Sequence, residues 1–229
     1  MSNLENIVNS SNNNGKHENW LARKLNNPNK GLVGKILDYA SGLAATTAAY
    51  SFIGTPALVS AAISTAADFI GNYMARKKTP SAKTRDTLWL SAMWSPVVTA
   101  AFKWMDMTID SSTLYGKVKR GLTQILGLPL AITPISFTSD YLVRHKTLNV
   151  KKAYERQVKP FWLARFKDML TYGSIPKMIT AFTIKDTYLK MYADQTINLA
   201  VGSTIGQKHI QKLDPYKMGY NTSYAPGYA

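Results

Sequence analysis

The sequence predicts an all-α fold, a polytopic membrane helix bundle of about four transmembrane helices arranged as two hairpins and followed by basic amphipathic helices. Three observations lead to this prediction. Long uncharged runs fill the middle of the chain, and charged residues bound each run. Basic residues gather in some connecting segments and are missing from others. Residues 144–229 carry 14 basic and 5 acidic side chains, so this region is far more basic than the bundle before it.

Composition narrows the classes of protein. A net charge of +15 and a pI near 9.8 would suit a nucleic-acid binder, but long uncharged runs do not, so we expect no nucleic-acid partner. The chain has no cysteine, which excludes disulfides and thiolate metal sites, and its three histidines lack zinc-type spacing. No catalytic-triad or phosphate-loop motif is present. We therefore predict no enzymatic activity, no metal and no cofactor.

Residues 1–30 form a polar N-terminal arm in our interpretation. They are rich in Asn, Ser and Gly, a composition that buries too little apolar surface to fold alone. Trp20, Leu21 and Leu25 allow one short amphipathic turn near the end of the arm. The arm also lacks the apolar core of a secretory signal.

The first two crossings are predicted at about 33–53 and 56–76. Between Asp38 and Asp68 lie 29 uncharged residues, and the sequence Gly54-Thr55-Pro56 interrupts this run. One crossing needs only about 20 residues, and proline is favourable in the first turn of a helix. Two helices joined by a very tight turn are the simplest interpretation. Small residues on both sides of the turn predict close antiparallel packing.

The second pair of crossings is predicted at about 86–105 and 121–143. Their uncharged cores are 16 and 19 residues long, and tryptophans near the ends of the first one are typical of membrane anchors. Pro96 lies in the middle of the third crossing. Pro129 and Pro134 lie five residues apart in the fourth, which predicts a kinked or locally unwound helix.

The distribution of basic residues sets the orientation of the bundle, residues 31–146. The loop 76–85 has five basic residues, whereas the turn 54–56 has none. Basic loops stay on the cytoplasmic side of a membrane. We therefore expect both termini on the cytoplasmic or matrix side of a plasma membrane or an inner organellar membrane.

Two further regions follow the bundle. Residues 147–213 read as basic amphipathic helices on the bilayer surface, with Trp162, Arg165 and Lys167 as membrane-surface contacts. Residues 214–229 read as an extended tail. Aromatic side chains in such a tail suit docking on a partner protein, and the candidates are Tyr216, Tyr220, Tyr224 and Tyr228.

Intramembrane acids carry the functional prediction. The topology places four aspartates near the cytoplasmic side, and carboxylates in membrane segments usually face the bundle or a cavity. The candidates for a transport pathway are Asp38, Asp68, Asp86, Ser95, Pro96 and Asp140. The alternative is structural: some of these acids favour helix N-termini, and the others pair with nearby bases. The two hairpins also begin and end alike, as in repeats of small transporters.

Short motifs add a resemblance to a known family. They are Leu37-Asp38-Tyr39-Ala40, Gly71-Asn72-Tyr73, Arg85-Asp86-Thr87-Leu88-Trp89-Leu90, Ser95-Pro96-Val97 and Ser139-Asp140-Tyr141-Leu142-Val143-Arg144. Through them, residues 33–146 resemble the small four-helix L-alanine exporters of bacteria and archaea. The resemblance implies ion-coupled export of a small amino acid, with an aspartate opening each hairpin.

Two functions therefore remain as alternatives. The first is an ion-coupled exporter of an alanine-like amino acid. The second is a non-catalytic structural or accessory subunit of a large respiratory, photosynthetic or viral membrane assembly, which the long polar ends and the tyrosine tail favour. In both cases the expected partners are the lipid bilayer and other subunits or copies of the chain.

Overall fold

The structure is a computed structural model that describes residues 20–74 and 79–201. These residues form helices joined by short turns and contain no strand, so the predicted all-α class is confirmed. In chain order the helices are α2 (Trp20–Leu25), α3 (Leu32–Ile53), α4 (Thr55–Met74), α5 (Ser81–Thr108), α6 (Leu114–Leu122), α7 (Leu128–His145), α8 (Val150–Ala153), α9 (Lys159–Asp168), α10 (Ser174–Thr183) and α11 (Thr187–Val201).

Three π-helical turns lie within the helices of the described residues. The turn η1 (Thr123–Gly127) joins α6 to α7, η2 (Tyr154–Val158) joins α8 to α9, and η3 (Met169–Gly173) joins α9 to α10. One continuous helix therefore runs from Leu114 to His145, and another runs over 150–183. Such turns are rare and often lie at functional sites.

Glycines and caps set the tight connections. Gly54, with φ of 68°, is the single residue between α3 and α4, and this backbone region favours glycine. Pro56 follows as the second residue of α4, where proline is tolerated. The hydroxyl of Thr113 accepts a hydrogen bond of 3.0 Å from the Gly116 amide and starts α6. A Cβ atom at Gly116 would lie 1.6 Å from the Asp110 carbonyl oxygen, so only glycine fits there.

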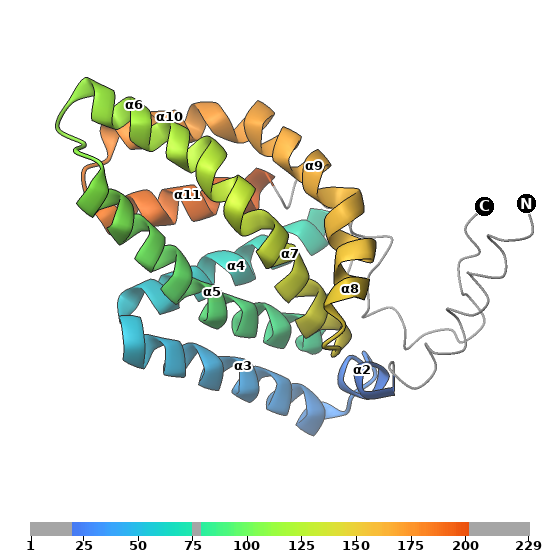
Figure 1. Cartoon of the computed structure of the whole chain (residues 1–229). Coiled ribbons are helices and arrows are strands. Elements are labelled where there is room, and N and C mark those ends of the chain that lie inside the picture. The colour runs from blue at the N-terminus through green and yellow to red at the C-terminus, as the bar shows by residue number, and fades with distance from the viewer. Residues whose placement is uncertain (1–19, 75–78, 202–229) are drawn as a thin grey trace, which may run out of the picture.

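The long helical segments run between the same two ends of the molecule (Figure 1). Helix α5 packs against both α3 and α4, and α7 packs against α5 and α9. Helix α11 packs on α4, α5 and α10, while α10 packs on α6. The region predicted to form amphipathic surface helices therefore packs on the bundle over residues 150–201.

Small residues bring α3 close to α5. A Cβ atom at Gly42 would lie 2.6 Å from Leu88 Cδ1 and 3.3 Å from Arg85 Cα. We expected small residues to bring α3 close to α4, and these two helices do contact each other. At Gly42, however, the close neighbour is α5. This approach places Arg85 next to the buried face of α3.

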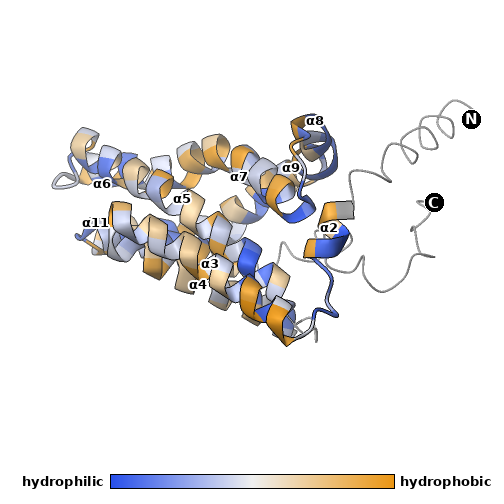
Figure 2. Ribbon diagram, turned by 90° about the horizontal axis from the view of Figure 1, so that it is seen from below, coloured by the Kyte–Doolittle hydropathy of each residue, from blue (hydrophilic) through white to orange (hydrophobic). Residues whose placement is uncertain are grey.

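Small residues and polar residues make up most of the interior of the described part of the chain. Eighteen buried residues are hydrophobic, eight of them alanines, and eighteen are polar or charged. Large apolar side chains lie outside instead: Leu32, Phe52 and Met107 are 75%, 85% and 86% exposed. Figure 2 shows hydrophobic residues along α7 and hydrophilic residues gathered around α2 and α8. A protein folded in water usually buries its large apolar side chains and keeps its charged side chains on the surface.

One helix of the described residues, Leu114–His145, is long and apolar enough to cross a bilayer, as judged by length and composition. Only 22% of its most apolar window is buried within the molecule. Helices α3 and α4, at 22 and 20 residues, have the length of a crossing but are rich in Ala, Ser and Thr. These small side chains lower the hydropathy of both helices.

Candidate functional site: two buried ionic clusters

The four predicted aspartates meet at one end of the bundle, beside the segment that follows α2. We call Asp38, Asp68, Asp86 and Asp140, together with the basic residues Lys30, Lys83, Arg85, Arg144 and Lys146, the aspartate cluster. The acids come from α3, α4, α5 and α7. The bases join these helices to one another, because each acid lies within 4.0 Å of at least one basic side chain.

Arg85 is the centre of the first half of this cluster. Its NH1 atom lies 2.7 Å from Asp38 Oδ1, and its Nε atom lies 2.8 Å from Asp86 Oδ1. Lys30 Nζ lies 2.9 Å from both Asp38 oxygens, and Lys146 Nζ lies 2.7 Å from Asp86 Oδ1. Asp38, Arg85 and Asp86 are 4%, 7% and 1% exposed, so these ion pairs are buried.

Arg144 organises the second half. Its Nε atom lies 2.5 Å from Asp140 Oδ1, and its NH2 atom lies 4.0 Å from Asp68 Oδ2. Thr87 donates a hydrogen bond to Asp68, and Lys83 Nζ lies 3.8 Å from Asp68 Oδ1. These contacts tie α4, α5 and α7 together.

Asn26, which sequence reasoning missed, links the two halves. Its side-chain oxygen accepts a hydrogen bond of 3.2 Å from Arg85 NH2, and its amide nitrogen donates one of 2.8 Å to the Arg144 carbonyl. The residue is only 3% exposed. The end of the predicted N-terminal arm is therefore part of the cluster.

Lys146 lies just after the end of α7 and shows the competing effects in this cluster. Burial lowers the pKa of its ammonium group, while the nearby Asp86 carboxylate opposes that shift. The ion pair with Asp86 thus offsets part of the cost of removing the charge from water.

The remaining pathway candidates lie further along α5. Ser95 is 1% exposed and lies on the buried face that also holds Thr87, Ser91 and Thr99. Pro96 is half-buried and α5 continues through it. A row of hydroxyl groups therefore runs along the inner face of α5, away from the aspartate cluster.

Sequence reasoning missed a second buried group, which lies among α6, η1, α10 and α11. We call Arg120, Gln124, Lys177 and Asp194 the inner cluster. Lys177 Nζ lies 3.0 Å from Asp194 Oδ1 and 3.3 Å from the Gln124 carbonyl oxygen. Asn198 donates a hydrogen bond of 2.7 Å to Asp194 Oδ2. The four members are 0%, 0%, 1% and 4% exposed.

Two members of the inner cluster have unused hydrogen-bonding atoms. Arg120 NH1 pairs with Asp106 and lies 3.4 Å from Ser111 Oγ, but its buried Nε and NH2 atoms have no partner among the described residues. Neither side-chain amide atom of Gln124 has one either. Buried groups of this kind are rare and call for an explanation.

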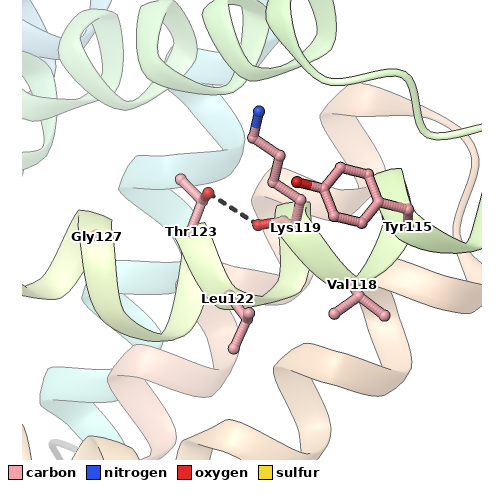
Figure 3. Close-up of a pocket in the computed structure, with 6 residues that line it drawn as sticks. All are labelled: Tyr115, Val118, Lys119, Leu122, Thr123 and Gly127. Atoms are coloured by element: carbon pink, nitrogen blue, oxygen red, sulfur yellow. Dashed lines mark hydrogen bonds between the residues drawn. The ribbon is translucent and has the colours of Figure 1, made fainter.

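A surface hollow of about 350 Å³ lies along α6 and η1 (Figure 3). It is lined by Tyr115, Val118, Lys119, Leu122, Thr123 and Gly127. None of the residues predicted for a transport pathway lines this hollow. Gln124 directly follows Thr123 but belongs to the buried face.

The C-terminal candidates are only partly described. Arg165 NH2 lies 2.5 Å from the Asn198 carbonyl oxygen on α11, and Trp162 stacks on Phe166 with ring centroids 6.3 Å apart. Lys167 is exposed. Their contact with a membrane surface stays a prediction. The four tail tyrosines lie outside the described residues, as does any docking role for them.

Comparisons of the chain with protein families, with curated proteins and with solved structures find no match. Within residues 20–74 and 79–201, no group of three or more histidine, aspartate or glutamate side chains lies close enough together to hold a metal ion. The geometry of the two clusters therefore carries the functional argument.

Proposed function

We propose that this protein is an integral membrane protein that moves a small polar solute across the bilayer. The observation that carries this proposal is the distribution of side chains: polar and charged residues are as numerous as hydrophobic ones in the interior, and many large apolar side chains lie on the outside. In lipid, an apolar exterior is stable and helices associate through small and polar residues. In water, the same surface would be unfavourable.

The crossings we propose are α3, α4, α5 and the continuous helix Leu114–His145. The last of these meets the length and hydropathy of a crossing, and the others have the length and the exposed apolar faces. Since the chain has no cysteine, single cysteines can report the topology. Thr55→Cys and Ser112→Cys are exposed positions at one end, and Leu148→Cys is exposed at the other.

An impermeant thiol reagent added to intact cells should label Thr55→Cys and Ser112→Cys but not Leu148→Cys, because the basic side faces the cytoplasm. In broken cells all three should react. Labelling of all three in intact cells would contradict a membrane-spanning bundle, and the reversed pattern would invert the proposed orientation.

Buried groups without partners favour transport over a purely static role. Each one costs about 1–3 kcal/mol of stability, and a solute or ion that pairs with such a group would recover that cost. Intramembrane ionisable residues commonly mark a substrate or ion pathway. The resemblance to L-alanine exporters makes a small amino acid the first solute to test.

In this proposal the aspartate cluster is a gate at the cytoplasmic end. Arg85 holds α3 and α5 together through Asp38 and Asp86, so opening this end requires those ion pairs to separate. Solute or protons would compete for the same carboxylates. This assigns Asp38 and Asp86 a role in gating, with Asp68 and Asp140 pairing α4 and α7 in the same way.

A structural or accessory subunit remains the second candidate function. The full pairing of the four acids favours it, because paired carboxylates are suited to holding helices in one arrangement. Exposed apolar side chains such as Phe52 and Met107 would then contact neighbouring subunits as well as lipid.

Efflux of labelled L-alanine from proteoliposomes separates the two candidates. The parent protein should release alanine faster than empty vesicles, and Asp86→Asn should slow release because it removes the carboxylate shared by Arg85 and Lys146. Asp110→Asn changes an exposed acid and serves as the control. No efflux from the parent protein, together with its purification only as part of a larger complex, would favour the structural subunit.

A further inference from the structure

We propose that Arg120 and Gln124 form a buried binding site for a small carboxylate. Neither side chain is exposed, and together they hold four nitrogen or oxygen atoms without partners among the described residues. No residue of the aspartate cluster takes part. The site stands whether or not the protein moves a solute.

The free atoms of Arg120 have the geometry that a carboxylate needs. Its NH1 atom is occupied by Asp106 and Ser111. The free Nε and NH2 atoms form one edge of the guanidinium plane, and two parallel N–H bonds from such an edge fit the two oxygens of a carboxylate. An ammonium group at this position would offer only a point charge.

Gln124 lies four residues after Arg120, so both side chains face the same side of the helix. Its free amide offers one donor group and one acceptor group. The amide nitrogen can donate to a carboxylate oxygen, and the amide oxygen can accept from a second polar group on the same ligand. The pair therefore suits a carboxylate that also carries a donor.

Local charge favours an anion at this place. Lys190 is 3% exposed on α11, and the positive charges of Arg120 and Lys117 oppose its own charge. The acids that face the Lys190 ammonium group are Asp106 and Asp186. Around Lys190 the bases therefore outnumber the acids, and this excess of positive charge favours a bound anion.

A flexible side chain and an irregular helical turn lie next to the site. A Cβ atom at Gly121 would lie 2.5 Å from Met178 Sδ on α10, so a flexible side chain packs directly beside the site. Gln124 itself belongs to the π-helical turn η1. Such turns are common where a helix carries a binding site.

The test measures thermal unfolding of the full chain in detergent micelles with sodium acetate, compared with sodium chloride at equal ionic strength. A ligand that binds the folded state raises the unfolding midpoint with its concentration. Acetate should raise the midpoint of the parent protein in a saturable way. Acetamide, which has the same shape and no charge, should not.

Variants assign the effect to the site. Arg120→Met should abolish the acetate shift, and Arg120→Lys should weaken apparent acetate affinity by about tenfold, because it keeps the charge and loses the bidentate edge. Gln124→Leu should also weaken it. Lys119→Met, on the exposed face of α6, should leave the shift unchanged.

Equal effects of acetate and chloride on the parent protein would overturn the assignment, as would an apparent acetate affinity in both Arg120→Lys and Gln124→Leu that equals that of the parent protein. If Arg120→Met does not fold, these two milder variants still decide the question. A saturable acetate shift in a protein without alanine efflux would keep the site and remove the transport proposal.

Discussion

The aspartate cluster and the inner cluster bury the same kinds of side chain but differ in how those side chains are paired. In the aspartate cluster, Arg85 has a carboxylate on each of two nitrogens, and every acid has a base. In the inner cluster, Arg120 shares one carboxylate, and two of its nitrogens have no partner among the described residues. Both sites take charge out of water. The first pairs each of its acids with a base, whereas the second pairs Lys177 with Asp194 but leaves part of the Arg120 guanidinium without a partner among the described residues.

The backbone differs at the two clusters as well. The acids of the aspartate cluster lie on regular α-helical turns. Gln124 lies on the π-helical turn η1, and α10, which carries Lys177, begins directly after η3. Regular helices whose charged side chains are all paired suit a site that holds the helices in one arrangement. Irregular turns beside unpaired groups suit a site that receives a ligand.

Removal of Arg85 should have the largest effect on stability. Arg85→Met keeps the length of the side chain but leaves Asp38 and Asp86 without their shared cation. Breaking a buried ion pair by removing one partner costs about 3–5 kcal/mol. Equilibrium unfolding in mixed micelles should show a loss of this size for Arg85→Met.

Lys35→Met is the matched control, because Lys35 is exposed on α3 and its removal leaves the cluster intact. It should change the unfolding free energy by no more than about 0.5 kcal/mol. Similar losses in the two variants would mean that the aspartate cluster does not hold the helices together.

The pair of Lys177 and Asp194 should show a somewhat smaller effect, and one that a second change can reverse. Lys177→Met removes the cation beside Asp194 and leaves the hydrogen bond from Asn198, which should cost about 3 kcal/mol. Lys177→Met/Asp194→Leu removes both charges and should recover most of that loss. Unfolding free energies of the two single variants and the double variant give the coupling.

Additive effects of the two substitutions would contradict this interpretation, because partners in one ion pair must couple. The result also sharpens the comparison with the aspartate cluster. There, each base touches more than one acceptor, so no single second substitution can restore stability.

Much of the aspartate cluster could be predicted from the sequence. Asp38, Asp68, Asp86 and Asp140 stand at the ends of long uncharged runs, and an antiparallel order of helices brings such ends to one side. The residues that pair with these aspartates and join the cluster were harder to predict from the sequence. Asn26 lies in a polar segment that resembles a solvated arm, and only its contacts with Arg85 and Arg144 show that it is buried.

The inner cluster could not be predicted in the same way. Arg120 follows Lys117 and Lys119, and three bases in a connecting segment look like a solvated loop. Its burial depends on α10 folding back onto α6, about sixty residues later in the chain, with α11 packed on α10. The mixture of bases and aromatic residues in that region instead suggested helices on a membrane surface.

Among single substitutions in the two clusters, the smallest stability change should come from Arg120→Met, although Arg120 is the largest fully buried side chain of the described residues. The substitution loses the pair with Asp106, whose side chain is 29% exposed, so solvent already weakens that interaction. It also removes two buried N–H groups without partners, which relieves about 1–3 kcal/mol of desolvation cost. The two effects oppose each other, and we expect a net change within about 1 kcal/mol of the parent protein.

Equilibrium unfolding without added carboxylate, beside Arg85→Met, is the measurement that checks this. A loss of about 3 kcal/mol or more would mean that Arg120 is as well compensated as Arg85, and the contrast between the clusters would fail. If the loss is small, the same titration repeated in acetate should separate the two proteins, because only the parent protein keeps the free guanidinium edge. Arg120 would then contribute to stability mainly when a ligand supplies the partner that the fold lacks, whereas Arg85 contributes at all times.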